Sequence, residues 1–87
     1  MAFYCYILQC ADGSYYCGWS KDVERRVNMH NQGMGARYTR ARRPVELVYM
    51  EQVESHSDAL KRERKLKNKT HEQKASLASQ FSEQANA

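Results

Sequence analysis

The sequence predicts one α+β domain in which a small three-stranded antiparallel sheet is flanked by helices, in the order β-β-α-β-α-α. Two segments rich in aromatic and β-branched residues, 3–10 and 14–19, enclose a turn signal, and residues 45–53 alternate in polarity. Elsewhere apolar residues recur at helical spacing. With 87 residues, 41% of them hydrophobic, the chain has room for one core. We place that domain in residues 1–80 and expect residues 81–87 to be a frayed polar tail.

The first two strands are joined by residues 11–13 (Ala-Asp-Gly), which are typical of a β-hairpin turn. A two-residue Asp-Gly turn would put Tyr6 and Tyr16 on opposite faces of the sheet. A three-residue turn with Gly13 in a left-handed conformation would set Tyr6 opposite Gly18 and leave both tyrosines on one face. The sequence leaves both registers open.

The first helix is expected to begin at Ser20 or Asp22, either of which can cap it, and to close at Gly33, which suits a left-handed C-terminal residue. Residues 34–44 then read as a basic loop that ends at the single proline. The strand at residues 45–53 follows this loop.

A second helix follows Ser55 or Ser57, with Asp58 in its first turn. Residues 70–73 (Thr-His-Glu-Gln) have the form of a capping box and start a third, short helix that we expect to end at Leu77.

Composition excludes several classes of protein. No apolar run approaches the ~18 residues that a membrane span needs, and the first residues lack the basic region of a signal peptide. Cys5, Cys10 and Cys17 are odd in number and lack Cys-x-x-Cys spacing, so neither a disulfide framework nor a zinc site is indicated. We therefore expect a cytoplasmic chain with buried thiols and no membrane contact.

The charge is divided into blocks. The net charge is +4, yet residues 21–43 hold seven bases and two acids, residues 44–60 hold four acids, and residues 61–69 hold six bases and one acid. Basic blocks favour a polyanionic partner, although a charge of this size also serves solubility alone.

Glu63 is the first candidate for chemistry. On the second helix it lies within the stripe formed by Ala59, Leu60 and Leu66. A carboxylate in that position is costly to desolvate unless a cation or metal satisfies it. The alternative is an ordinary salt bridge at the edge of the stripe.

Arg26 and His30 form the second candidate, an i,i+4 pair beside Val23 and Val27 on the first helix. Both should lean over the sheet, where a guanidinium and an imidazole can address a phosphate. The alternative is a solvated arginine and a partly buried histidine.

The third candidate is the tyrosine-rich hairpin, with Trp19 at its end and four phenols at Tyr4, Tyr6, Tyr15 and Tyr16. Tyrosine is also simply a good strand former, which is the alternative explanation.

Taken together, these residues resemble a known family. Tyr4-Cys5-Tyr6, then Tyr16-Cys17-Gly18, then an arginine, a histidine and a glutamate follow the order and spacing of the GIY-YIG nuclease superfamily, over about residues 3–66. The segments 6–8, 11–14, 37–40 and 43–45 are most similar to small stand-alone bacterial proteins of the YhbQ-like type. The chain departs from the motif where Tyr4 replaces its glycine and Cys5 and Cys17 replace its isoleucines. Trp19 stands where some relatives have a lysine.

The resemblance implies a metal-dependent endonuclease that hydrolyses a DNA phosphodiester bond, with one Mg²⁺ or Mn²⁺ on Glu63. It assigns Tyr6 to receive the proton of the attacking water, Tyr16 and His30 to position water or phosphate, and Arg26 to stabilise the transition state. A phenol with a pKa near ~10 is a poor base at neutral pH, so nearby positive charge is expected to favour its ionised form.

The resemblance also implies a nucleic-acid-binding surface. Gly18 would let the phosphate approach the backbone, Tyr38 or Trp19 would offer a stacking face, and the basic loop would follow the substrate strand. The residues expected to contact nucleic acid are Gly18, Trp19, Lys21, Arg37, Tyr38, Thr39, Arg40, Arg42 and Arg43.

Two further functions are kept as alternatives. The first is a nucleic-acid-binding module on the same fold with little or no turnover, and the second is a protein adaptor that uses the acidic segment 45–58. We expect DNA as the partner, with RNA as an alternative, and a monomer without an obligate protein partner.

Overall fold

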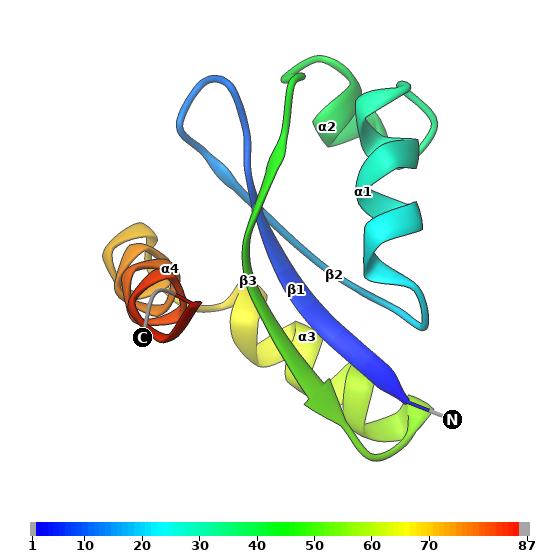
Figure 1. Cartoon of the computed structure of the whole chain (residues 1–87), viewed down its shortest axis with the longest axis vertical. Coiled ribbons are helices and arrows are strands. Elements are labelled where there is room, and N and C mark those ends of the chain that lie inside the picture. The colour runs from blue at the N-terminus through cyan, green and yellow to red at the C-terminus, as the bar shows by residue number, and fades with distance from the viewer. Residues whose placement is uncertain (1, 86–87) are drawn as a thin grey trace.

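The computed structural model describes residues 2–85 and contains the predicted order of elements with one addition (Figure 1). The strands β1 (Phe3–Gln9), β2 (Tyr15–Ser20) and β3 (Glu46–Val53) form one antiparallel sheet in the order β2-β1-β3. The helices are α1 (Val23–Asn31), α2 (Arg37–Arg40), α3 (His56–Lys67) and α4 (His71–Ala85). The predicted α+β class and three-stranded sheet are confirmed. Across the described residues, no helix has the length and apolar composition needed to span a bilayer.

The hairpin adopts the three-residue turn. Gly13 has φ 86°, and the backbone N–H of Cys10 donates to the carbonyl of Ser14 at 2.8 Å. Tyr6 consequently pairs with Gly18, and Leu8 pairs with Tyr16. This register places the Tyr6 and Tyr16 side chains on the same face of the sheet.

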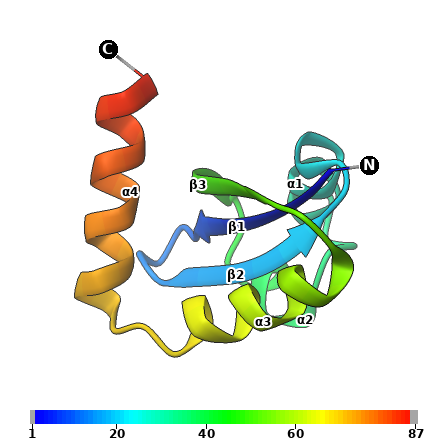
Figure 2. The same cartoon turned by 90° about the horizontal axis from the view of Figure 1, so that it is seen from below.

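Each face of the sheet has its own core. One face packs Cys5, Ile7 and Cys17 against Ala59 and Leu66 of α3. The opposite face packs a second cluster against α1 and the start of β3: Tyr6, Leu8, Cys10, Val23 and Val45. Figure 2 shows the three strands side by side, with α3 running below β2 and α4 standing beside the sheet. All three cysteines are free and buried, as the sequence predicts.

The helices differ from the sequence predictions at two places. Residues 37–40 form α2 inside the predicted loop, because the N–H of Arg40 donates to the carbonyl of Ala36 at 3.0 Å. The predicted end of the last helix at Leu77 is wrong, since α4 continues to Ala85 and Phe81 packs on Tyr49 with ring centroids 5.9 Å apart. The division of the chain at residue 80 stays a prediction, and residues 86–87 lie outside the described residues.

Leu60 was expected in the buried stripe of α3, but its side chain is 46% exposed. The buried positions of this helix are Ala59 and Leu66. Gly33 has the expected left-handed conformation, with φ 85° after the end of α1.

Asn31, the last residue of α1, connects this helix to the sheet. Its side-chain amide donates to the carbonyl of Val45 at 3.0 Å, and its side-chain oxygen accepts from the N–H of Val45 at 2.7 Å. Val45 is 5% exposed, so water could not easily replace either bond. The amide of Asn31 therefore acts as a substitute strand partner where β3 begins.

We predict that Asn31→Ala lowers the free energy of unfolding by about 1–3 kcal/mol, because it leaves a backbone donor and acceptor of Val45 without partners. The matched control is Asn28→Ala on the same helix, whose exposed side chain makes no hydrogen bond within residues 2–85 and should change stability by less than about 0.5 kcal/mol. Urea denaturation measures both, and equal losses would contradict the prediction.

Candidate functional site

A cleft of about 460 Å³ brings the predicted chemical groups together. Tyr6 comes from β1, Tyr16 from β2, Arg26 from α1 and Glu63 from α3, and these elements meet at the β2 edge of the sheet. The complete lining is Tyr6, Tyr16, Gly18, Trp19, Ser20, Lys21, Arg26 and Glu63. A larger groove of about 620 Å³ lies between α1 and β3, but it contains none of these four groups.

A chain of buried hydrogen bonds lies behind the cleft. The Tyr6 hydroxyl is 3.1 Å from His30 Nε2, and His30 Nδ1 is 2.8 Å from Thr39 Oγ1. Thr39 Oγ1 donates its single proton to the carbonyl of Ala36 at 3.1 Å. Thr39 must therefore accept from His30 Nδ1–H, which leaves Nε2 without a proton. His30 Nε2 is consequently the acceptor, and the Tyr6 hydroxyl is the donor.

Burial keeps this pair neutral. Desolvation, opposed by the nearby Arg26 guanidinium, raises the pKa of the Tyr6 phenol to about 12. Desolvation and the charge of Arg26 lower the pKa of His30 from its usual 6.5. Arg26 favours the ionised phenol, as expected from the sequence, but burial outweighs this effect and keeps the pKa of Tyr6 above its usual value.

Two glycines make room for this chain. A Cβ atom on Gly18 would lie 2.6 Å from the Tyr6 hydroxyl, and one on Gly35 would lie 2.1 Å from His30 Nδ1. The space over Gly18, expected to admit a phosphate, is therefore occupied by the Tyr6 ring. The sequence alone does not indicate this role of Gly35, because a glycine in a basic loop resembles an ordinary loop residue.

Glu63 also lines the cleft, with its side chain 21% exposed. Its Oε1 is 3.3 Å from Lys67 Nζ, one helical turn later, so the predicted edge salt bridge is also present. Within residues 2–85 no group of three or more His, Cys, Asp or Glu side chains could enclose a metal. A single carboxylate fits Mg²⁺ or Mn²⁺ only when water and substrate oxygens supply the remaining ligands, as these ions commonly allow.

Arg26 is held at the cleft by a hydrogen bond to the backbone. Its Nη2 donates to the carbonyl of Gly35 at 3.1 Å, while its side chain still lines the cleft. The remaining N–H groups of the guanidinium can therefore bind an anion.

Comparison with known proteins identifies the family to which this site belongs. Residues 2–76 match the GIY-YIG catalytic domain. The chain belongs to the GIY-YIG family.

Its relatives include small bacterial proteins of the UPF0213 family. A UPF0213 protein of Staphylococcus saprophyticus is 49% identical over 77 residues, covering 88% of this chain and 94% of that protein. A UPF0213 protein of Staphylococcus aureus is 54% identical over 72 residues, covering 83% and 88%.

Two solution NMR structures share the GIY-YIG fold of this chain. The UPF0213 protein of Bacillus halodurans is 42% identical with a TM-score of 0.56, covering 91% of this chain and 84% of that one. A protein from E. faecalis is 40% identical with a TM-score of 0.61, covering 93% and 86%. The nuclease-like fold and the YhbQ-like relationship expected from the sequence are thus confirmed.

The residues expected to contact nucleic acid divide into two groups in this GIY-YIG domain. The Arg37 and Arg40 side chains are exposed and make no hydrogen bond or ion pair within residues 2–85. Thr39 is fully buried against His30, so its place on the contact surface is corrected. Arg43 donates from Nε to the carbonyl of Arg40 at 3.0 Å and contributes to holding the loop.

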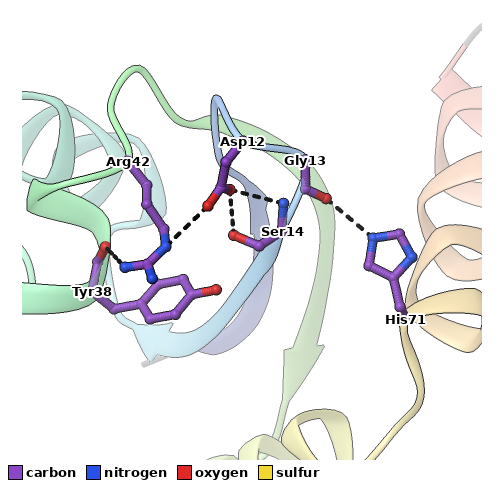
Figure 3. A network of polar contacts seen from close by, with 6 residues as sticks. All are labelled: Asp12, Gly13, Ser14, Tyr38, Arg42 and His71. Carbon is purple, nitrogen blue, oxygen red and sulfur yellow. Dashed lines mark hydrogen bonds and ion pairs between the residues drawn. The ribbon is translucent and has the colours of Figure 1, made fainter.

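Two nitrogens of the Arg42 guanidinium likewise bond to other residues of this chain. Its Nε donates to Asp12 Oδ2 at 3.1 Å, and its Nη1 donates to the carbonyl of Tyr38 at 2.9 Å (Figure 3). In the same view, His71 at the start of α4 lies 3.1 Å from the Gly13 carbonyl through Nε2. The hairpin turn is therefore held from both sides.

Trp19 and Lys21, which also line the cleft, each contact other side chains of this chain. Trp19 packs on His56 with ring centroids 4.7 Å apart and on Phe3 at 6.1 Å. Lys21 Nζ lies 5.3 Å from the centroid of the Phe3 ring. Both Trp19 and Lys21 still line the cleft, so their expected contact with substrate stays a prediction.

We predict that Thr39→Val lowers the free energy of unfolding by about 1–3 kcal/mol, because the buried His30 Nδ1–H loses its acceptor while the side-chain shape is kept. Thr39→Ser, which retains the hydroxyl, should keep more of that stability. Nitrogen NMR of the wild type should show the Nδ1–H tautomer of His30. A dominant Nε2–H tautomer would contradict the direction assigned to the chain.

His30 also gives a pH prediction. Its pKa is lowered in the folded state, so the unfolded chain binds this proton more readily. The contribution of His30 to stability is therefore complete above about pH 6.5 and is lost progressively as the pH falls below that value. Thermal unfolding across this range should show a slope that His30→Gln reduces; an unchanged slope would mean that His30 titrates normally in the folded protein.

Proposed function

We propose that this chain is a metal-dependent nuclease that hydrolyses a DNA phosphodiester bond in the cleft. One observation supports this proposal above the others: a single cleft holds a carboxylate, a guanidinium and a phenol whose proton has a fixed acceptor. Glu63, Arg26 and Tyr6 are these groups, and His30 Nε2 is the acceptor. Hydrolysis of a phosphodiester needs a metal ligand, a cation for the developing charge and a route for the proton of water.

Tyr6 and His30 act as a pair in this proposal. With a pKa raised to about 12, Tyr6 is protonated at neutral pH and cannot be a standing base. Its oxygen can nevertheless accept a proton from the attacking water while its own proton moves to His30 Nε2, 3.1 Å away. The water O–H bond and the Tyr6 O–H bond break, and new bonds form to the Tyr6 oxygen and to His30. The proton therefore ends on the imidazole, and Tyr6 stays neutral.

Arg26 and Glu63 serve the phosphate. The guanidinium of Arg26, fixed on the Gly35 carbonyl, can bind the non-bridging oxygens and stabilise their increasing charge. Glu63 would hold the divalent ion. When bound there, Mg²⁺ or Mn²⁺ supplies Lewis-acid stabilisation of the phosphate and the leaving oxygen.

The basic surface beside the cleft favours a nucleic-acid substrate. Arg37 and Arg40 on α2 have free guanidinium groups within residues 2–85, and Lys21 lies at the rim of the cleft. Exposed cations can contact a phosphate backbone without reading sequence. We propose DNA as this substrate, with RNA as the alternative that the assay below separates.

A second function, a binding module without turnover, is favoured by the ion pair of Glu63 with Lys67. At 3.3 Å the lysine already neutralises the carboxylate, which then needs no metal. Both functions use the same basic surface. They differ in whether product forms and whether the product depends on a metal.

We predict that the wild type nicks DNA only when Mg²⁺ or Mn²⁺ is present, and that Glu63→Gln lowers this rate at least about 100-fold, the scale of one lost electrostatic contact in a transition state. The measurement is a cleavage panel over single-stranded, duplex, flap and branched DNA, with matched RNA strands.

Lys67→Ala is the matched control, since it breaks the same ion pair from the other side. If Glu63 holds the metal, Lys67→Ala should cleave normally or need less metal. DNA binding without metal-dependent product in the wild type would instead identify the binding module.

A further inference from the structure

Tyr38 and Arg42 form a stack on the outer side of Tyr16. The Tyr16 and Tyr38 rings are stacked with centroids 6.1 Å apart and an interplanar angle of 27°. The guanidinium carbon of Arg42 lies 3.8 Å from the centroid of the Tyr38 ring. Asp12 Oδ2 accepts from Arg42 Nε at 3.1 Å and closes the stack at the hairpin turn (Figure 3).

This stack continues into the buried hydrogen-bond chain. On its inner side the Tyr16 ring meets His30 edge-on, with centroids 5.2 Å apart. Tyr38 and Thr39 are consecutive residues of α2, so one short helix contacts Tyr16 through the first and His30 through the second. The position of α2 is thus linked to that of the Tyr16 ring in the cleft and of the His30 ring behind it.

The contacts of Arg42 distinguish it from the other arginines of this segment. Arg42 makes three intramolecular contacts at the surface: Nε donates to Asp12, Nη1 donates to the Tyr38 carbonyl, and one face of the guanidinium lies on the Tyr38 ring. Arg40, two residues earlier, has an exposed side chain without such contacts in the described chain. A residue that binds phosphate would be expected to resemble Arg40 and not Arg42.

We propose that Tyr38 and Arg42 are positioning residues, which hold the Tyr16 phenol at the cleft through a stack anchored on Asp12. This inference rests on the proposed nuclease function and adds to it two residues that do not touch the phosphate. Asp12 supports the stack with a second contact, because its Oδ1 also accepts from the backbone N–H of Ser14 at 3.0 Å. Asp12 therefore joins Arg42 to the hairpin that carries Tyr16.

Two pairs of variants test the stack kinetically. Tyr38→Phe keeps the ring and should keep kcat, whereas Tyr38→Leu removes the ring and should lower kcat on the order of 10- to 100-fold, the effect of misplacing a group in the site. Arg42→Lys keeps the charge for Asp12 but loses the flat face, and should also lower kcat. Arg25→Lys is the control, because the exposed Arg25 side chain makes no hydrogen bond or ion pair within residues 2–85, and it should alter neither kcat nor KM.

Substrate affinity separates positioning from direct contact. The KM and the DNA-binding constant of Tyr38→Leu and Arg42→Lys should stay within about 2-fold of the wild type, because no phosphate or base contact is lost. If Tyr38 instead stacks on a base, Tyr38→Leu should weaken binding about 10-fold or more. That outcome, with kcat unchanged, would overturn the proposal.

NMR of ring-labelled tyrosine tests the stack without any turnover. The Tyr16 ring resonances should move in Tyr38→Leu and Arg42→Lys and return in Tyr38→Phe, while the remaining signals show that the fold is intact. Asp12→Asn, a milder change at the exposed turn, should move them in the same direction. Unmoved Tyr16 resonances would overturn the proposal.

The two proposals can fail separately. If the Tyr16 resonances move but the wild type cleaves no substrate, the proposed nuclease function fails, whereas the role of the stack in holding Tyr16 stands.

Discussion

The hydrogen-bond chain of Tyr6, His30 and Thr39 is the constraint on which the rest of this structure depends. Each of the three side chains is 1% exposed or less, so every polar atom in the chain must find its partner inside the protein. Within the described part of the molecule, no buried side-chain nitrogen or oxygen lacks a partner. Because the three residues belong to β1, α1 and α2, the hydrogen bonds between them determine how these elements meet. Since Thr39 can only accept from the imidazole, the chain also determines which ring nitrogen faces the tyrosine.

Much of the fold could be predicted from the sequence, because strand and helix patterns are local properties. The hairpin register could not, since its turn residues permit two pairings. The pairing adopted sets Gly18 opposite Tyr6, where a side chain would collide with the phenol. This register depends on the packing of the Tyr6 ring across the sheet, which the residues of the turn do not determine. The extra length of α4 has a similar cause, because Phe81 finds Tyr49 on a distant strand.

The candidate site was predictable in its residues but less so in their roles. The motif spacing identified Tyr6, Arg26 and Glu63, which the fold does bring to one cleft. Thr39 and Arg42 were expected to face nucleic acid, because hydroxyl and guanidinium groups in a basic loop usually face solvent. The loop folds back instead, so that these groups satisfy His30 and Asp12. Whether an arginine meets a phosphate or a carboxylate of its own chain is a long-range property, which sequence spacing does not contain.

The opposite pKa shifts of Tyr6 and His30 have a consequence for when a proton can move between them. Burial raises the pKa of the phenol to about 12 and lowers the pKa of the imidazole, so charge separation between the two is disfavoured at rest. Arg26 contributes to this state, because its positive charge opposes a second positive charge on His30. An anionic phosphate bound to Arg26 would offset that repulsion and make His30 a better proton acceptor. The guanidinium that binds the substrate would thereby also switch on the proton route, and the pair would stay neutral until the cleft is filled.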